Sequence, residues 1–443
     1  MELVRALRIE SGQVVAFVGA GGKSSAIRRL VRELAGKSPV LATTSTKLAL
    51  NESDLTEKHK IVEDAGGLIT ILSDWNRDES LLLTGPQLAD EPKWDGLSLA
   101  QLQDVIEFSR EKKVILLIEA DGAGGRSLKA PAAHEPALPH NLDLLVPVLG
   151  VDAVGEALGS NLVHRKDEIQ AALGLADDEQ MSVENIARLL RHPAGGLKAL
   201  PLHAELKILI NKVESDVQLT NANQIAELAL EEHKIRSVVI GALQRDDPVR
   251  LARGQVAAIV LAAGESKRFE DNKLLHVWRG KPLLEHVLDA VRASKVQRRV
   301  LVLGHDHQRV LASINHEGFQ IVHNSEWQQG QSTSVVAGLE ALEGEIEAAL
   351  FPLGDMPMID PGLIDRLIDR HAETLAAIIA PQIDAEWGNP VLFDRVTFNS
   401  FSELEGDRGA KALFPEYEII PVEAGSGAQF DVDTEQDLSD PDV

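Results

Sequence analysis

Short runs of apolar residues recur along the chain, and several of them end in glycine, hydroxyl or carboxylate side chains. Uninterrupted runs such as residues 114–118 and 256–261 are typical of strands that are buried on both faces of a parallel sheet. Other segments carry apolar residues at helical spacing, as residues 27–34 do after the first strand. This alternation of buried strands and amphipathic helices predicts α/β domains with three layers.

A polar, proline-containing segment at residues 245–254 separates two such series of strands and helices. We expect the domain boundary there, with one domain at residues 1–248 and a second at residues 255–443. A chain of 443 residues is long enough for two domains that each bury a core of their own.

A glycine-rich loop follows the first buried strand and leads into a helix. Its candidate nucleotide-binding residues are Gly19, Gly21, Gly22, Lys23, Ser24 and Ser25. In a phosphate-binding loop the backbone N–H groups and the helix N-terminus face the phosphates, a lysine adds positive charge, and a serine hydroxyl ligates Mg²⁺. The strict form of that motif is not met, because Phe17 stands where its first glycine should be. We therefore expect a P-loop-type parallel sheet in the first domain, with a structural glycine turn as the alternative.

Two carboxylates, Glu119 and Asp121, follow the apolar run at residues 114–118. A carboxylate at the end of a buried strand beside a phosphate loop holds Mg²⁺ directly or through water. We expect Ser24 to share this ion, and only one of the two carboxylates to touch it.

The run at residues 208–210 leads into Asn211, Lys212 and Glu214. This pattern resembles the N-K-x-D guanine-recognition element of GTP-binding proteins, with Glu214 in the carboxylate position. A carboxylate there would accept two N–H bonds from guanine, which adenine cannot offer. The pattern is short and glutamate replaces aspartate, so both ATP and GTP remain candidates for the first domain.

Several motifs of the first half occur together, namely GAGGKSS, ATTSTK, EADGAGGRSLKAPAAHEP, VHR and INKVE. Over about residues 10–245 they resemble the selenium-dependent hydroxylase accessory family (YqeC-type). The resemblance implies a part in the maturation of a molybdenum hydroxylase. The partner would then be that hydroxylase or its maturation chaperone.

The second half opens with a buried strand that ends in small residues, at Leu261, Ala262, Ala263 and Gly264, with Arg268 and Lys273 in the loop that follows. Small residues let backbone N–H groups approach a ligand closely, and basic side chains suit a phosphate-bearing one. A solvated basic loop after an ordinary strand is the alternative.

Further polar residues follow the later strands of this half. Gly330, Ser332 and Ser334 lie at a strand-to-helix turn that suits a nucleotide. Asp355 follows a buried strand, where it is well placed to hold Mg²⁺ against an α-phosphate, and Asp433 could complete that site.

The motifs LAAGESKRF, NKLL, NSEWQQGQSTS, GDMP, GNPVLF, GDRGAK and DVDT follow one another in this half. Together they resemble the molybdenum-cofactor nucleotidyltransferase family, in particular its cytidylyltransferase branch. The guanylyl branch carries L-A-G-G where this chain has L-A-A-G at residues 261–264. One departure is Glu270-Asp271, where the family usually has glycine. The resemblance implies a Rossmann-like nucleotidyltransferase domain with a mostly parallel sheet.

The implied reaction joins CTP and Mo-molybdopterin to give the cytosine dinucleotide cofactor and pyrophosphate. Mg²⁺ (or Mn²⁺) would lie on Asp355 and Asp433, Arg268 and Lys273 would neutralise the phosphates, and the substrate contacts would include Asn389 and Arg408. The alternatives are another nucleotidyltransferase (sugar or alcohol phosphate, or guanylyl), a non-catalytic cofactor chaperone, and a reaction centred on the first domain.

Composition narrows the class of protein further. A formal net charge of −25 argues against general nucleic-acid binding, and the absence of cysteine excludes disulfides and thiolate metal sites. No apolar segment reaches the length of a membrane span, and the N-terminus lacks the features of a signal peptide. We expect a cytoplasmic protein that acts on small molecules.

Overall fold

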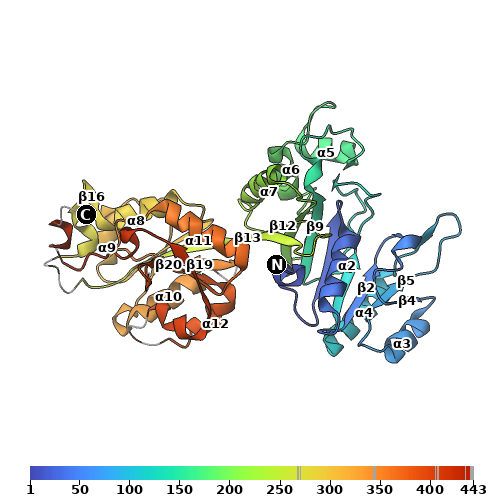
Figure 1. Cartoon of the computed structure of the whole chain (residues 1–443), viewed down its shortest axis with the longest axis horizontal. Helices are drawn as coiled ribbons and strands as arrows, with labels where there is room; N and C mark the ends of the chain where they lie inside the picture. The colour runs from blue at the N-terminus through green and yellow to red at the C-terminus, as the bar shows by residue number, and fades with distance from the viewer. Residues whose placement is uncertain are drawn as a thin grey trace. The chain divides into compact units, whose positions relative to one another are not determined.

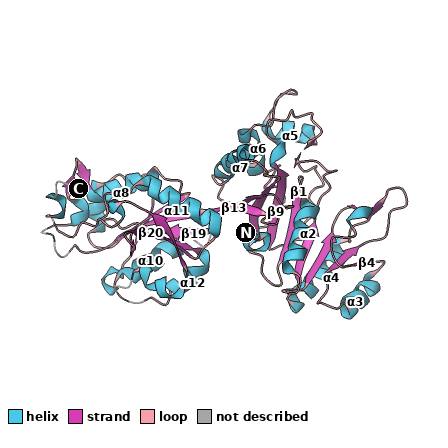
Figure 2. Cartoon of the chain, in the orientation of Figure 1, coloured by secondary structure: helices cyan, strands magenta, loops and turns pink. Residues whose placement is uncertain are grey.

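The computed structural model describes residues 1–266, 269, 271–342, 346–404, 406, 409–434 and 436–439. The chain divides into two compact units, Met1–Ala252 (the N-terminal unit) and Arg253–Val443 (the C-terminal unit). In each unit a strand layer lies between helices, as Figures 1 and 2 show. None of the helices in the described residues is both long and apolar enough to cross a membrane.

The N-terminal unit is built on a nine-stranded sheet of order β13-β12-β11-β9-β1-β7-β2-β5-β4. The neighbouring strands from β12 to β4 pair in parallel. The strands are β1 (Val14–Gly19), β2 (Val40–Thr44), β3 (Leu48–Ala49), β4 (Lys58–Ile61), β5 (Leu81–Thr84), β6 (Lys93–Trp94), β7 (Ile115–Glu119), β8 (Leu128–Lys129), β9 (Leu144–Gly150), β10 (Val163–His164), β11 (Glu205–Asn211), β12 (Ile235–Gly241) and β13 (Val249–Gly254). The helices are α1 (Leu3–Leu7), α2 (Lys23–Leu34), α3 (Ala65–Asp74), α4 (Leu99–Lys112), α5 (Lys166–Leu173), α6 (Val183–Arg191) and α7 (Asp216–Ala229).

The central strand β1 explains the layering of this unit, because it is buried and its successive side chains point to opposite faces. Val14, Ala16 and Val18 belong to one core cluster with residues of α3, α4, α6 and α7. Helix α2 contacts β1, β2 and β7, and α1 packs on α2. The predicted three-layer, parallel α/β arrangement is therefore confirmed for this unit.

The C-terminal unit contains an eight-stranded sheet of order β18-β17-β14-β19-β22-β20-β21, with β23 beside β20. The strands from β18 to β19 are parallel, and β22 runs antiparallel to both of its neighbours. The strands are β14 (Val256–Ala262), β15 (Val277–Trp278), β16 (Lys281–Pro282), β17 (Arg298–Leu303), β18 (Gln320–His323), β19 (Ala348–Leu350), β20 (Ile378–Ile383), β21 (Glu386–Trp387), β22 (Leu392–Asp394) and β23 (Ile419–Glu423). The helices are α8 (Leu283–Arg292), α9 (His307–Ser313), α10 (Gln331–Glu340), α11 (Pro361–Thr374) and α12 (Phe398–Phe401).

Alternate residues of β14 again separate two cores. Val256, Ala258 and Val260 pack with residues of α8 and α11, whereas Ala257 and Ile259 pack with residues of α10 and α12. The predicted mostly parallel Rossmann-like sheet is confirmed, with β22 and β21 as its antiparallel members.

The connector between the two series of elements is partly a strand. Residues 245–254 read as a polar segment, but Val249–Gly254 form β13 at the edge of the N-terminal sheet. Val249, Ala252 and Arg253 are buried, so apolar contact and edge pairing order the second part of the segment.

Candidate functional site

The predicted phosphate loop, residues 19–25 (called the phosphate loop below), is a tight turn between β1 and α2. The backbone of Gly21 has a φ of +87°, and a Cβ atom there would lie 2.2 Å from the backbone nitrogen of Gly150. The Gly21 N–H donates to the carbonyl oxygen of Arg126, at 2.7 Å. Only glycine fits this position, because both the backbone angle and the space exclude a side chain.

Lys23, Ser24 and the two predicted carboxylates lie together at the start of α2. The buried Lys23 ammonium donates to the Gly19 carbonyl at 2.7 Å, and it lies 3.2 Å from an Asp121 oxygen and 3.7 Å from a Glu119 oxygen. The Ser24 hydroxyl donates to Glu119 Oε2 at 3.0 Å. Burial raises the pKa of Glu119, and the charge of Lys23 offsets only part of that rise. A lysine, a hydroxyl and a carboxylate in this arrangement suit the phosphates and the cation of a nucleotide.

A cavity of about 820 Å³ opens from the phosphate loop. Its lining includes the predicted residues Gly21, Gly22, Lys23, Ser24, Ser25, Glu119, Asn211 and Lys212. Arg126 and Asp152 also line it, and sequence reasoning did not single them out. Both belong to loops whose approach to the phosphate loop depends on the sheet order rather than on a local pattern. A cavity of this size suits a nucleoside triphosphate.

Asn211 and Lys212 are held by hydrogen bonds at the end of β11. The Asn211 amide donates to the Gly21 carbonyl at 2.8 Å and accepts from the Leu243 N–H at 3.0 Å. The Lys212 ammonium donates to Ser127 Oγ at 2.7 Å and to Asp152 Oδ2 at 2.9 Å. Asn211 thus links the phosphate loop to the segments that follow β11 and β12.

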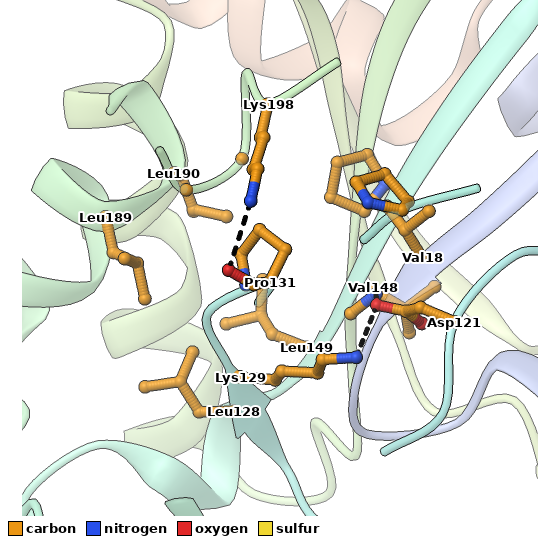
Figure 3. Close-up of a pocket in the computed structure, with 15 residues that line it drawn as sticks. Val18, Asp121, Leu128, Lys129, Pro131, Val148, Leu149, Leu189, Leu190 and Lys198 are labelled. Carbon is orange, nitrogen blue, oxygen red and sulfur yellow. Dashed lines mark hydrogen bonds and ion pairs between the residues drawn. The ribbon is translucent and has the colours of Figure 1, made fainter. Parts of the chain in front are cut away.

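Asp121 and Gly19 lie in the wall of a second, smaller cavity of about 40 Å³ (Figure 3). Asp121 Oδ2 accepts from the Gly19 N–H and from the Lys129 ammonium, both at 2.9 Å. Figure 3 shows the Lys129 side chain pointing toward Asp121 beneath Pro131 and Leu149. Of the two predicted metal carboxylates, Glu119 therefore lines the large cavity and Asp121 the small one.

The Lys129 side chain begins a buried row of charges that sequence reasoning missed. Its ammonium lies 2.7 Å from Glu135 Oε2, and Arg165 donates to both oxygens of Glu135. Burial acts to raise the pKa of Glu135, but the hydrogen bonds from Lys129 and Arg165 outweigh it and hold the pKa below its ordinary value. Because every member of the row is paired, we assign it a structural part in fixing Asp121 beside Lys23.

Substituting alanine at Gly21 is expected to destabilise the N-terminal unit by about 2 kcal/mol or more, because its Cβ would clash with backbone and its positive φ would be strained. Gly122→Ala is the matched control, since Gly122 lines the same cavity and a Cβ there meets no atom within 4 Å. Thermal unfolding of the two variants provides the measurement. Equal unfolding temperatures would contradict the close approach described for Gly21.

The C-terminal unit has a cavity of about 200 Å³ where β14 ends. Its lining includes the predicted residues Leu261, Ala263, Gly264, Gly330, Ser334 and Asp355. Trp327 also lines it and was missed, since a single tryptophan in the turn between β18 and α10 gives no signal of its own. Its indole ring offers a flat apolar surface for a base.

Asp355 reaches this cavity because residues 352–354 run beside the end of β14. The Leu261 N–H donates to the Pro352 carbonyl, and the Gly354 N–H donates to the Leu261 carbonyl, both at 2.9 Å. The Val432 N–H in turn donates to the Asp355 carbonyl at 3.1 Å. Three segments far apart in the sequence are thereby joined at one point.

The Lys273 ammonium lies at that point. It is 2.5 Å from Asp355 Oδ2 and 4.0 Å from Asp433 Oδ1, and it donates to the Val432 carbonyl at 3.1 Å. Asp431 was missed as a member of the group: burial, then the charge of Asp355, raises its pKa. The carboxylates therefore form a negative site around one ammonium.

The donor set around Lys273 fits a hard cation only in part. Carboxylate oxygens are the ligands that Mg²⁺ prefers, and Asp355 and Asp433 supply them. Within the described residues, however, no three His, Asp or Glu side chains are grouped so as to hold a metal ion. A cation here would need further oxygens from a bound substrate, as Mg²⁺ in nucleotide sites usually does.

The other predicted residues of this unit occupy varied positions. Ala262 and Ser332 are buried and do not belong to the cavity lining. The Asn389 N–H donates to the Ala428 carbonyl at 2.7 Å, just before the segment that carries Asp431 and Asp433. Arg268 and Arg408 lie outside the described residues.

Two family models match the chain. Residues 15–167 match the family described as YqeC protein, and residues 258–420 match the MobA-like NTP transferase domain. Each match lies within one of the two compact units.

Curated relatives agree with this division. The chain is 29% identical over 245 residues to the "Uncharacterized protein YqeC" of Escherichia coli K12, covering 52% of this chain and 88% of that protein. It is 32% identical over 136 residues to the bifunctional protein GlmU of Desulfitobacterium hafniense Y51. That match covers 30% of this chain and 29% of GlmU, so the chain spans less than a third of that relative.

Among solved structures, Rv0371c from Mycobacterium tuberculosis H37Rv is 26% identical, with a TM-score of 0.39. The match covers 42% of this chain and 96% of that one. These matches confirm the YqeC-type resemblance of the first half, and they confirm the resemblance of the second half at the level of a MobA-like NTP transferase domain. The chain therefore carries a segment that matches the YqeC family model and, after it, a segment that matches the MobA-like NTP transferase domain.

Proposed function

We propose that the C-terminal unit transfers a cytidylyl group from CTP to Mo-molybdopterin, which yields the cytosine dinucleotide cofactor and pyrophosphate. We propose also that the N-terminal unit binds a nucleoside triphosphate, ATP or GTP, during maturation of a molybdenum hydroxylase. The observation that carries the first proposal is the position of Lys273 between Asp355 and Asp433 beside a cavity at the end of β14.

In this reaction the terminal phosphate of the pterin attacks the α-phosphorus of CTP. A new P–O bond forms to that phosphorus, and the bond to the β-phosphate oxygen breaks, so that pyrophosphate leaves with its charge. The attacking phosphate is already largely ionised near neutral pH, since its second pKa is about 6, and no general base is required. The protein then contributes mainly position and charge.

The residues around the cavity would divide this work. The small residues Ala263 and Gly264 let the phosphates lie close to the backbone at the end of β14. Lys273 would turn from Asp355 to the phosphates, where its charge stabilises the leaving pyrophosphate. Asp355 and Asp433 would hold Mg²⁺ or Mn²⁺, which when bound would offset the charge that develops at the α-phosphate.

Base selection is assigned to the end of β14. Leu261 and Ala263 line the cavity. We propose that the Ala263 methyl group takes space that a larger purine base would need. The resemblance to the cytidylyl branch points the same way, because the guanylyl branch carries glycine at the position of Ala263.

The substrate test measures pyrophosphate release by the full chain with CTP, GTP or UTP, each with Mo-molybdopterin or with a sugar phosphate. CTP with Mo-molybdopterin is expected to be at least 10-fold better than any other pair, and Ala263→Gly is expected to raise the relative use of GTP. If a sugar phosphate is turned over instead, the unit is a nucleotidyltransferase that acts on sugar phosphates, and the molybdopterin proposal is wrong. If Mo-molybdopterin binds tightly and no pyrophosphate is released, the unit is a cofactor chaperone and not a transferase.

A further inference from the structure

The cavity of the N-terminal unit extends well beyond the phosphate loop. Lys23 and Ser24 line it where α2 begins, and Glu214 and Gln218 line it where α7 begins. Residues after β12, such as Leu243, belong to the same lining. The lining also includes Lys47, Asn51 and Glu52, on the side of β2. A triphosphate bound at the phosphate loop has room for its nucleoside among the residues that follow β11 and β12, where Glu214 lies.

The order of the strands explains this arrangement. Strands β1, β9, β11 and β12 are neighbours and parallel, so their carboxyl ends meet at the same edge of the sheet. Ligands of open α/β sheets bind at that edge. The Asn211 amide holds the Gly21 carbonyl and the Leu243 N–H at the same time, so the phosphate loop and the far end of the cavity are fixed relative to each other.

Glu214 is held in place while its carboxylate stays available. Its backbone N–H donates to Gln218 Oε1 at 2.9 Å, which ties it to the capping box at the start of α7. The Glu214 carboxylate itself has no hydrogen bond or ion pair with the residues that the structure describes. A fixed backbone with an available carboxylate suits recognition of a ligand group.

The chemistry of a carboxylate limits which base it selects. An ionised carboxylate only accepts hydrogen bonds, through two oxygens. Guanine presents two adjacent N–H donors, at N1 and at its 2-amino group, and a single carboxylate can accept from both. Adenine has a ring acceptor at N1, which a carboxylate repels.

We propose that the N-terminal site is selective for guanine nucleotides and that Glu214 is the residue that reads the base. This inference deepens the proposed nucleotide site of the N-terminal unit and rests on it. The two hydrogen bonds to a charged acceptor would favour GTP over ATP by about 10-fold or more.

The test uses the full chain and non-hydrolysable analogues of GTP, ATP and xanthosine triphosphate. The C-terminal unit is proposed to bind nucleotides as well, so its binding must be subtracted. The affinity compared is therefore that of the binding which is present in the unchanged chain and lost in Lys23→Ala. Glu214→Gln is expected to weaken the GTP analogue by about 10-fold or more, to leave the ATP analogue unchanged, and to strengthen the xanthosine analogue. An amide presents one acceptor and one donor, which match the N1–H and the 2-oxo group of xanthine.

Asp104→Asn is the matched control, because it removes one exposed carboxylate from α4, away from the cavity lining. It should bind all three analogues as the unchanged chain does. Guanine selectivity is overturned if the Lys23-dependent binding is equal for the GTP and ATP analogues, or if Glu214→Gln leaves it unaltered. In either case the proposed phosphate site still stands. Absence of any Lys23-dependent binding would overturn both.

Discussion

Replacing Asp355 with asparagine is expected to reduce CTP-dependent pyrophosphate release by about 10²- to 10³-fold, a loss typical of removing one group that stabilises transition-state charge. Asp355 lines the cavity and lies 2.5 Å from the Lys273 ammonium. The variant keeps the shape of the side chain but loses the charge that would hold both Lys273 and a cation. Its side chain is only partly buried, at 21% exposure, so we expect the unit to stay folded.

The measurement is the rate of pyrophosphate formation at saturating CTP and Mo-molybdopterin, with thermal unfolding as the test of folding. Glu373→Gln is the control variant, because Glu373 is an exposed carboxylate in the last turn of α11. Helix α11 ends just before β20 begins, so Glu373 lies at the opposite edge of the sheet from Asp355. Pyrophosphate release that Asp355→Asn leaves undiminished would remove Asp355 from the reaction.

The second large effect is a loss of nucleotide affinity at the N-terminal unit, which we expect from Lys23→Ala. Loss of the ammonium should weaken nucleoside triphosphate binding at the N-terminal unit by about 100-fold or more, because its charge and donors face the phosphates. Pyrophosphate release by the C-terminal unit should not change, since each unit has its own core and its own cavity.

Lys23→Ala also changes stability with a defined dependence on pH. In the unchanged chain Lys23 opposes the rise in the pKa of Glu119 that burial causes, so without Lys23 that pKa rises further. A carboxyl group whose pKa is raised by folding contributes stability at low pH, and that contribution is lost as the pH rises through the raised pKa. The variant should therefore be less stable than the unchanged chain at neutral pH, with a smaller difference in acid.

Two further variants separate the loss of binding from this loss of stability. Ser24→Ala leaves Lys23 in place and removes the hydroxyl that donates to Glu119, so it should weaken Mg²⁺-dependent binding in a folded unit. Lys112→Ala removes a partly exposed lysine of α4 and should alter neither binding nor stability. Unaltered nucleotide affinity in Lys23→Ala and Ser24→Ala would show that the phosphate loop is only a structural turn.

Much of each unit follows from local pattern. The apolar runs of β1, β7, β9 and β14 are buried and uninterrupted, and such runs are typical of strands inside a parallel sheet. The loop at residues 19–25 could likewise be located, because glycines with Lys23 and Ser24 between a strand and a helix are the pattern of a phosphate-binding loop. The structure of the connector at residues 245–254 was harder to predict, because its second part becomes strand β13 by pairing with β12 at the edge of the sheet.

Local patterns along the chain therefore predict where strands end, which polar residues stand at those ends, and that both halves contain glycine-containing turns suited to phosphate. Which of these strand ends lie beside one another depends on the folded sheet. Lys273, Asp355 and Asp433 come together because β14 and the segment after β19 run side by side, with residue 432 bonded to Asp355. The order of strands is set by the packing of the whole sheet, which no local spacing encodes. The order of strands in the N-terminal sheet likewise brings Glu214 into the lining of the cavity that Lys23 lines.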